Sequence, residues 1–225
     1  ELRVGASNND MTTGEPLYVK ARRGVVLASG GFGRDVEWRM QHDPRLDGSV
    51  DCTNAAGATA ESLCTAIECG ALPVHLDWIQ CGPWCSPDEE GYGVGPTWID
   101  SVAGYAPSID PKTGERCVNE LTDRKRYCDV IFEVGEPLIQ VSNESNVPEW
   151  SRYSLDAALE AGVSWKFDTL EEIAERFGMP LDAFKAQMER YNKIVETKVD
   201  DEFGKTILGF FSDEPGFANE KGTTG

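Results

Sequence analysis

Thiols are the first side chains in the sequence whose type and spacing could do chemistry. Cys81 and Cys85 lie four residues apart, and two thiolates at this spacing could bind zinc. A structural zinc site takes four ligands, however, and the nearest imidazole is that of His75, with no second cysteine pair following. The spacing therefore predicts no metal site.

The seven cysteines are odd in number and scattered along 225 residues. A small secreted domain held by disulfides would carry a denser and usually even set. The pattern therefore favours reduced thiols in a reducing compartment. His42 lies in a predicted loop and His75 among apolar residues of an extended segment, so both imidazoles are predicted to be surface or structural groups.

Two further stretches have an open interpretation when taken alone. The apolar, strand-like run Gly24–Ala28 stops at Ser29, and three of the next four residues are glycines, around Phe32. No Gly-x-Gly-x-x-Gly phosphate-binding loop occurs in the sequence. Arg124 lies in a charged run, 123–126, where it is either a solvated surface charge or a functional cation.

Composition excludes several classes of partner. The formal net charge is −18, from 39 acidic and 21 basic side chains, which would repel nucleic acid and anionic membranes. With 40% hydrophobic and 27% charged residues, the chain has the composition of a globular protein. No apolar run approaches the roughly 20 residues that span a bilayer. Because the sequence opens with Glu1, we expect it to be a piece of a longer protein.

In the first half of the sequence, the patterns predict mainly strands and turns as the elements that position these residues. In order, the patterns predict a hairpin over 2–28, a helix over 57–70, an extended segment over 73–80, a loop over 81–108 and a second hairpin over 109–121, turned at 110–114. A loop of this length inside a domain is uncommon unless it binds something.

Helical patterns dominate from residue 151 onward. Thr169 and Glu172 form a capping box that predicts a short helix ending at Gly178. One apolar face is predicted for the longer helix that follows, made of Leu181, Phe184, Met188, Tyr191 and Val195. Strands followed by helices predict an α+β fold, with a domain boundary near residues 32–36.

Three segments carry motifs that occur in the same order in one protein family. Lys20–Phe32 resembles the strand-to-loop segment of the fumarate reductase/succinate dehydrogenase flavoprotein family (FAD-dependent oxidoreductase 2). Thr53–Glu61 looks like its Thr-Asn…Gly-Ala-Thr-Gly-Asp-Gly segment, and Lys112–Arg124 resembles its Gly-x-Arg-Phe-x-Asn-Glu…Arg run. Further matches keep the family's order at 70–72, 78–80, 169–177, 190–192, 203–205 and 215–218.

The resemblance implies a fold and a domain organisation. The chain would be the capping, substrate-side domain of a flavoprotein with a short β hairpin from its FAD-binding domain. Residues 1–35 would belong to the FAD-binding domain, 36–215 to the capping domain, and 216–225 to the return toward the FAD-binding domain. The family's N-terminal Gly-x-Gly-x-x-Gly, which places the pyrophosphate at a helix N-terminus, is absent, so the chain alone is not expected to retain FAD.

FAD is the cofactor that the resemblance implies for the complete protein. Glycines in the first segment would let the backbone approach the flavin closely, because they lack a Cβ. The segment that follows Thr53 departs from the family's Gly-Asp-Gly, which is Ala60-Glu61-Ser62 here. The residues implied to contact FAD are Ala28, Ser29, Gly30, Gly31, Thr53, Asn54, Thr59 and Glu61.

The resemblance also implies a reaction, the reduction of the C=C bond of an unsaturated carboxylic acid. In the family, flavin N5 delivers a hydride to one carbon and an arginine of the capping domain protonates the other. Arg124 falls on that arginine. Arginine is a weak acid with a pKa above about 12, so it must be resupplied with protons through a carboxylate. Asp100 is the candidate carboxylate.

The substrate side departs from the family's pattern. Gly82-Pro83-Trp84 stands where fumarate reductases carry His-Pro-Thr. Two donors to a substrate carboxylate are thereby replaced by one indole N–H and apolar surface. The resemblance therefore implies an acid other than fumarate, larger and less symmetric, contacted by Gly82, Trp84 and Glu120.

The family suggests partners and a place in the cell. The electron donor would be a protein, a quinol or a cytochrome of bacterial anaerobic respiration. The compartment would be the bacterial cytoplasm or periplasm, and the reduced thiols favour the cytoplasm. Two alternatives stay open: a flavin dehydrogenase of the ketosteroid-dehydrogenase type, and an acidic stand-alone binding module without catalytic activity.

Overall fold

The computed structural model of the chain describes residues 2–7, 12–86, 104, 106–206 and 223–224. Its α-helices are α1 (Val36–His42), α2 (Glu61–Glu68), α4 (Arg124–Val134), α5 (Arg152–Ala161), α6 (Leu170–Phe177) and α7 (Leu181–Thr197). Its strands are β1 (Leu2–Val4), β2 (Glu15–Leu17), β3 (Ser108–Asp110), β4 (Glu115–Arg116), β5 (Ile139–Gln140), β6 (Ser142–Asn143), β7 (Lys166–Phe167) and β8 (Thr223–Thr224). Two 3₁₀ turns, η1 (Glu144–Asn146) and η2 (Glu149–Ser151), precede α5.

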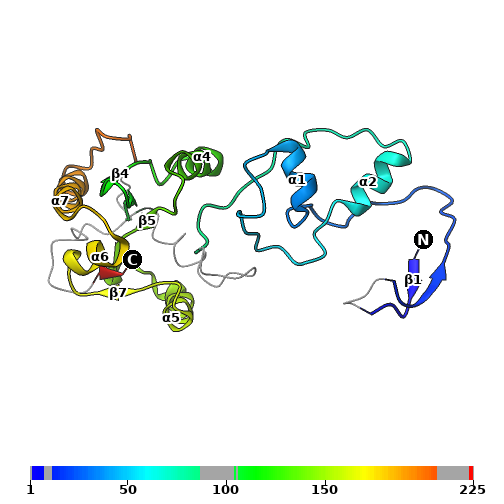
Figure 1. Ribbon diagram of the computed structural model, residues 1–225, viewed down its shortest axis with the longest axis horizontal. Helices are drawn as coiled ribbons and strands as arrows, with labels where there is room; N and C mark the ends of the chain where they lie inside the picture. Colours follow the sequence, from blue (N-terminus) through cyan, green and yellow to red (C-terminus); the bar gives the residue numbers. More distant parts are fainter. Residues whose placement is uncertain (1, 8–11, 87–103, 105, 207–222, 225) are drawn as a thin grey trace.

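The elements are arranged along an elongated molecule. Figure 1 shows the β1–β2 hairpin and the N-terminus at one end, helices α1 and α2 next to it, and helices α4 to α7 with the C-terminus at the other end. Most of the predicted loop over 81–108 lies outside the described residues. No helix in the described part of the chain is long and apolar enough to cross a membrane.

Three small antiparallel sheets lie among these helices, in the orders β1-β2, β4-β3-β5 and β6-β8-β7. In the second sheet, Ile109 pairs with Arg116 on one side and with Ile139 on the other. Gly114, at φ +72°, closes the β3–β4 turn by donating its N–H to the Asp110 carbonyl at 2.9 Å. This confirms the second predicted hairpin, and the mixture of helices and sheets confirms the coarse prediction of an α+β fold.

The largest core lies between α6, α7 and strand β3. On α7, the apolar residues recur every three or four positions, which places Phe184, Met188 and Tyr191 on one buried face. Ile109 of β3 is buried in the same cluster, and Leu181 packs against it while partly exposed. The predicted apolar face of the long helix is therefore confirmed.

Helix α6 begins where the capping box predicts. The Thr169 hydroxyl accepts a hydrogen bond from the Glu172 N–H at 3.2 Å, and the Glu172 carboxylate accepts one from the Thr169 N–H at 3.3 Å. Two N–H groups that the helix itself cannot satisfy thereby gain partners. Gly178, at φ +66°, ends the helix. The earlier predicted helix is α2, and Gly70 follows it at φ +96°.

Replacing Thr169 by alanine should lower the free energy of unfolding by about 1 kcal/mol, because the Glu172 N–H loses its acceptor at the helix start. Urea denaturation followed by circular dichroism would measure this loss. Glu175→Ala is the matched control, because this side chain is exposed on the same helix and should leave the midpoint nearly unchanged. Equal midpoints for both variants would show that the box contributes nothing.

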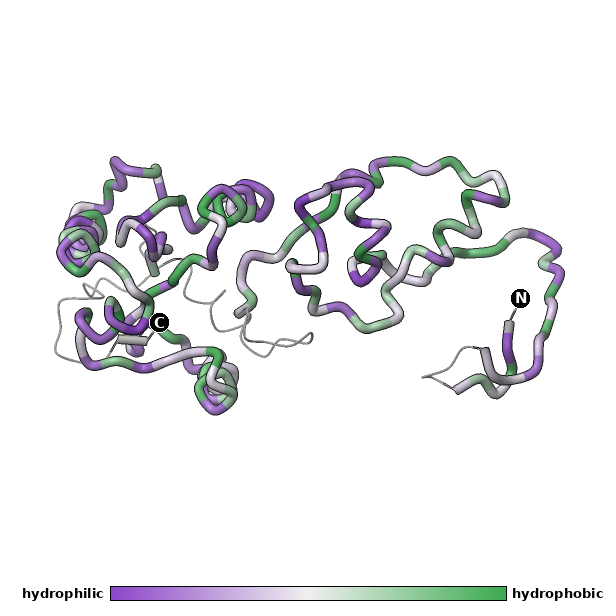
Figure 2. The backbone as a smooth tube through the Cα atoms, viewed as in Figure 1, coloured by the Kyte–Doolittle hydropathy of each residue, from purple (hydrophilic) through white to green (hydrophobic). Residues whose placement is uncertain are grey.

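Two predicted extended segments differ in the structure. Val25 and Val26 belong to no strand, because β2 alone pairs with β1, and their side chains are 86% and 89% exposed. Figure 2 shows hydrophobic residues along this segment between the hairpin and α1. Residues 73–80 turn, because His75 adopts φ +56° and the Trp78 N–H donates to its carbonyl. A strand-like run needs a partner strand to become a strand, and none lies beside these two among the described residues.

Candidate active site

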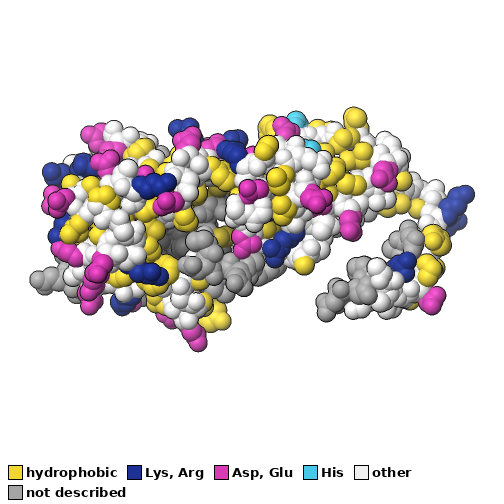
Figure 3. Space-filling view, viewed as in Figure 1, with side chains coloured by type: hydrophobic (Ala, Val, Ile, Leu, Met, Phe, Trp, Pro, Cys, Tyr) yellow, Lys and Arg dark blue, Asp and Glu magenta, His cyan; other side chains and the backbone are white. Residues whose placement is uncertain are grey.

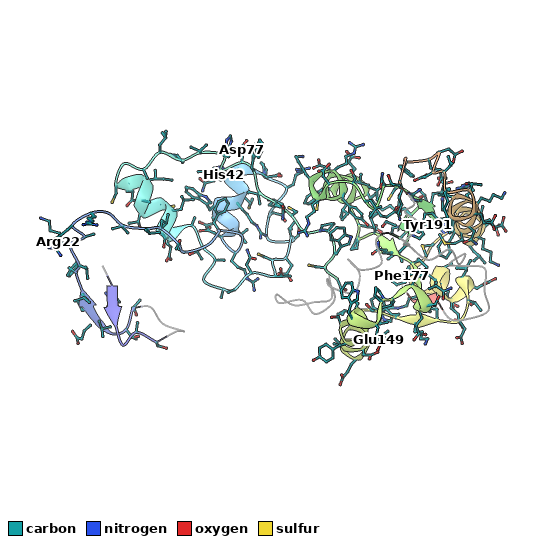
Figure 4. All side chains as sticks on the ribbon, turned by 180° about the vertical axis from the view of Figure 1, so that it is seen from behind. Arg22, His42, Asp77, Glu149, Phe177 and Tyr191 are labelled. Atoms are coloured by element: carbon teal, nitrogen blue, oxygen red, sulfur yellow. The ribbon has the colours of Figure 1, made fainter. Side chains whose placement is uncertain are left out.

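A cavity of about 700 Å³ lies where the part of the chain with α1 and α2 meets the part with α4 to α7. One wall is formed by residues 49–54 and 79–86, and the other by α4 and residues 136–140. Trp165 and Phe177 add aromatic surface to the lining. Figure 3 shows the junction of the two parts, and Figure 4 shows Phe177 on the side of α4 to α7. A largely apolar recess with a few polar groups is typical of a small-molecule site.

Trp84 lies over the first turn of α4 at this cavity. The guanidinium carbon of Arg124 is 5.5 Å from the centroid of the indole ring, and the Tyr127 ring meets the indole edge-on, with centroids 5.8 Å apart. Both partners belong to α4 and are three residues apart, so they lie on one face of the helix. The indole Nε1 is buried and has no hydrogen-bond partner among the described residues. This N–H is therefore a donor for which the described residues supply no acceptor.

The helix start fixes the backbone of Arg124. Asp123 has an extended backbone, and its carboxylate accepts a hydrogen bond from the Arg126 N–H at 3.0 Å, so α4 begins at Arg124. The Arg124 side chain is exposed, and no carboxylate of a described residue forms an ion pair with it. Asp100, the predicted proton source for this arginine, lies outside the described residues.

The ring of Tyr127, which packs against the Trp84 indole, is held in place by a buried hydrogen bond. Its hydroxyl forms a short hydrogen bond with the Ser108 hydroxyl of β3, and both groups are buried. Burial raises the pKa of Tyr127, so the phenol stays neutral. The edge-on contact with Trp84 is therefore made by a ring whose position the β3 strand fixes.

Glu120 lies in a buried ion network. Its carboxylate accepts hydrogen bonds from Arg116 Nε and Nη2, both at 2.9 Å, and from the Ser108 N–H at 2.8 Å. Lys205 Nζ lies 3.0 Å from the same carboxylate and donates to the Tyr191 hydroxyl at 2.7 Å. Glu120 is 1% exposed and does not line the cavity. The structure thus places this predicted substrate contact inside the fold, where it supports the residues that lead into α4.

The same network contains two shifted acid–base groups. Burial lowers the pKa of Lys205, and the Glu120 carboxylate opposes this shift. Burial opposes ionisation of Asp200, yet hydrogen bonds from backbone N–H groups and the Arg116 guanidinium, 2.8 Å away, hold the pKa of Asp200 below its usual value. Tyr191 of α7, labelled in Figure 4, belongs to this network: its hydroxyl accepts a hydrogen bond from Lys205, and its ring faces the Arg116 guanidinium.

The predicted FAD contacts fall into three groups. Thr53 and Asn54 line the cavity, whereas Ala28 to Gly31 are exposed on the segment before α1 and do not line it. Thr59 and Glu61 lie at the start of α2. Gly30 and Gly31 would have nothing within 4 Å of an added Cβ, so the backbone there is open to a bound group. Exposed glycine backbone and polar side chains fit a flavin nucleotide.

The end of the glycine-rich stretch contacts the second predicted segment. The Arg34 N–H donates to the Ala58 carbonyl at 3.0 Å, and Arg34 Nε donates to the Asn54 carbonyl at 3.0 Å. Asp35 accepts hydrogen bonds from the N–H groups of Trp38, in α1, and Ala60, just before α2. Asp35 thus caps α1 and ties the residue before α2 to it, so the structure brings together two predicted cofactor segments that are separate in the sequence.

Among the predicted substrate contacts, Gly82 and Trp84 do line the cavity. Sequence reasoning missed Tyr127, Cys128 and Cys81, which line it as well. The first two follow Arg124 by three and four residues, so helical spacing could have found them. Within the described residues, no three Cys, His, Asp or Glu side chains form a group that could hold a metal ion.

Comparison with known proteins gives a consistent assignment. The family model described as "FAD binding domain" matches residues 3–217. The acrylate reductase flavoprotein subunit of Shewanella woodyi is 37% identical over 211 residues, which cover 92% of this chain and 42% of that protein. The urocanate reductase of Eggerthella lenta is 27% identical over 207 residues, 89% of this chain and 33% of that protein. The chain thus spans less than half the length of these relatives.

A solved structure shows the same fold. The 3-ketosteroid delta1-dehydrogenase from Sterolibacterium denitrificans, in complex with 1,4-androstadiene-3,17-dione, matches with a TM-score of 0.72 at 22% identity. The match covers 94% of this chain and 42% of that protein. At this identity the similarity establishes the arrangement of the backbone and leaves the chemistry to the side chains around the cavity.

Proposed function

We propose a function from the premise that the chain belongs to the FAD binding domain family, whose model matches residues 3–217. This confirms the flavoprotein family predicted from the sequence. The chain supplies the capping, substrate-side part of an FAD-dependent oxidoreductase that reduces the C=C bond of an unsaturated carboxylic acid. The stacking of Arg124 on Trp84 supports the proposal, because it brings the proposed proton donor next to an indole N–H that could donate to the carboxylate of a substrate.

The substrate we propose is an acid with a single carboxylate. Trp84 has one N–H without a partner among the described residues, which could bind one carboxylate. A second carboxylate would need further donors, and the rest of the cavity lining is mainly apolar. Acrylate and urocanate, named for the two relatives, each carry one carboxylate, whereas fumarate carries two. This proposal adds the single carboxylate to the prediction of a larger and less symmetric acid, which stays a prediction.

The proposed reaction adds a hydride and a proton across the double bond. FAD, when bound, would supply the hydride from flavin N5. Arg124 delivers the proton to the carbon next to the carboxylate, because on the first turn of α4 it lies against Trp84, which lines the cavity. Trp84 supports the guanidinium by a cation–π contact and donates its N–H to the carboxylate. A carboxylate must then return the proton to Arg124, and Asp100 stays the proposed source.

The test is a flavin reoxidation assay with the complete, FAD-loaded protein. The flavin is reduced chemically without oxygen, and its absorbance is followed after addition of acrylate, urocanate or fumarate. We expect a monocarboxylate to reoxidise the flavin at least tenfold faster than fumarate. If no acid reoxidises it but a 3-ketosteroid reduces the oxidised flavin, the dehydrogenase alternative replaces the proposal. If neither reaction occurs, the chain belongs to a binding module.

Trp84→Phe tests the carboxylate donor separately. Phenylalanine keeps a ring beneath Arg124 but lacks the N–H, so we expect the KM for the acid to rise about tenfold, as for a lost hydrogen bond to a charged group. The kcat should change little, since the carboxylate is bound equally in ground and transition states. Trp165→Phe is the matched control, because Trp165 also lines the cavity and stacks on an arginine, Arg176. Equal KM values for both variants would remove this role.

A further inference from the structure

We propose that Cys81 and Cys128 are a dithiol site that a low-molecular-weight disulfide, such as oxidised glutathione, converts into an internal disulfide bond. The bond would join the segment that carries Trp84 to helix α4, which carries Arg124. Neither the proposed reductase function nor the bound flavin is needed for this chemistry, so the inference stands or falls independently of them.

The geometry rests on contacts between the same two elements at one cavity. Trp84 meets Arg124 and Tyr127 of α4. Cys81, three residues before Trp84, and Cys128, next to Tyr127, both line this cavity. The two thiols therefore face the same recess from the two elements that the proposed bond would join.

The two thiols differ in the way that a two-step exchange requires. Cys81 is half-buried at the cavity wall, whereas Cys128 is buried. The neighbouring Cys128 thiol lowers the pKa of Cys81 despite partial burial, so Cys81 is the more readily ionised thiol of the pair. Burial raises the pKa of Cys117 to about 12, and that thiol lies outside the cavity lining. Reactivity is thus concentrated on one of the two cysteines of the pair.

The reaction is balanced by thiol–disulfide exchange. The Cys81 thiolate attacks one sulfur of the oxidised glutathione, forming a mixed disulfide and releasing one glutathione thiolate. Cys128 then loses its proton to the released thiolate and attacks the Cys81 sulfur, which releases the second glutathione. Two electrons pass from the protein thiols to the reagent, which leaves as two thiols. A disulfide bond of about 2 Å then joins the Cys81 and Cys128 sulfurs.

The test is peptide mapping of the complete, FAD-loaded protein after incubation with oxidised glutathione. Remaining thiols are trapped with N-ethylmaleimide, and the protein is digested without reduction. Trypsin would leave five cysteines on one peptide, because no lysine or arginine occurs between Arg45 and Lys112. Chymotrypsin cleaves after aromatic residues and separates Cys81 from Cys85 at Trp84. We expect a peptide pair joined through Cys81 and Cys128 that disappears on reduction.

Two variants and a control decide the outcome. Cys128→Ala should abolish the joined pair and leave Cys81 carrying one glutathione, which shows both the attacking thiol and the order of steps. Cys81→Ala should abolish both products. Cys64→Ala, in α2, should leave the joined pair intact. A bond from Cys81 to Cys85 or Cys52, or full alkylation of Cys81 and Cys128 after oxidation, would overturn the proposal.

Discussion

Replacing Arg124 by alanine should slow the reoxidation of reduced flavin by the unsaturated acid about 10³-fold, within the range for loss of a general acid. The flavin should stay bound, because the described contacts of Arg124 are with the ring of Trp84 and not with the predicted cofactor segments. Rapid mixing of the acid with the reduced, complete protein would measure the rate, and the flavin absorbance of the same samples would measure retention.

The physical reason lies in the position of Arg124 and not in its acidity alone. A guanidinium keeps its proton in water, and the Arg124 side chain is exposed in this structure, so it protonates carbon only where a bound substrate lies against it and excludes water. The cap at Asp123 fixes the backbone, and the indole face of Trp84 orients the side chain. Arg124→Lys keeps the charge but loses the planar stacking group, so a rate between wild type and alanine is expected.

Arg126→Ala is the matched control for this prediction. Arg126 is exposed on the same helix, and its described tie to the helix start is a backbone N–H that alanine retains. Its replacement should change the rate less than twofold. If Arg124→Ala and Arg126→Ala both match wild type, Arg124 is a surface charge and another group supplies the proton.

The fold was predictable from the sequence where the signal is local. Residues close together in the sequence specify three features that the structure confirms. These are the capping box at Thr169, the β3–β4 turn at Gly114 and the buried helix face that contains Phe184. The strand character of Val25 and Val26 depends on a partner elsewhere, and no described strand pairs with them. Residue type alone cannot supply that information.

The candidate site divides in the same way. The motif that ends in Arg124 pointed to this arginine, and helical spacing from it leads to Tyr127 and Cys128. The contact of Trp84 with α4 depends on how a distant segment crosses the helix, so spacing could not predict it. The burial of Glu120 depends on Lys205, which is far along the chain, and the motif containing Glu120 gives no sign of this partner.

Replacing Glu120 by glutamine should lower the free energy of unfolding by about 3–5 kcal/mol, as for a buried ion pair that loses one partner. Glutamine keeps the size but removes the charge that faces Arg116 and Lys205, whose side chains are fully buried. Arg116 keeps Asp200 at 2.8 Å, whereas the partners that Lys205 keeps among the described residues are the Tyr191 hydroxyl and a backbone carbonyl. The cost therefore falls mainly on the lysine. Urea denaturation would measure it.

The pH dependence identifies the lysine as the cause. Burial already holds the folded-state pKa of Lys205 below its usual 10.5, and loss of the Glu120 charge should lower it further. At pH values between the folded-state and unfolded-state pKa of Lys205, the unfolded chain binds more protons than the folded chain. The free energy of unfolding therefore increases as pH rises through this range. The deficit of Glu120→Gln should thus shrink between pH 7 and pH 10. A deficit that stays constant would assign the loss to packing.

Two further variants separate charge from position. Adding Lys205→Met to Glu120→Gln removes the stranded cation, so the double variant should be more stable than Glu120→Gln alone, because an apolar side chain needs no counter-charge in this site. Lys125→Gln is the matched control. It breaks the ion pair of Lys125 with Asp129, which has the same four-residue spacing as the buried pair of Arg116 with Glu120, but its lysine is 76% exposed, so the midpoint should stay unchanged. The two pairs share their spacing and differ in burial, so a large loss of stability at Glu120 alone would show that burial makes this carboxylate a structural support of α4. Equal small losses would show that the network is dispensable.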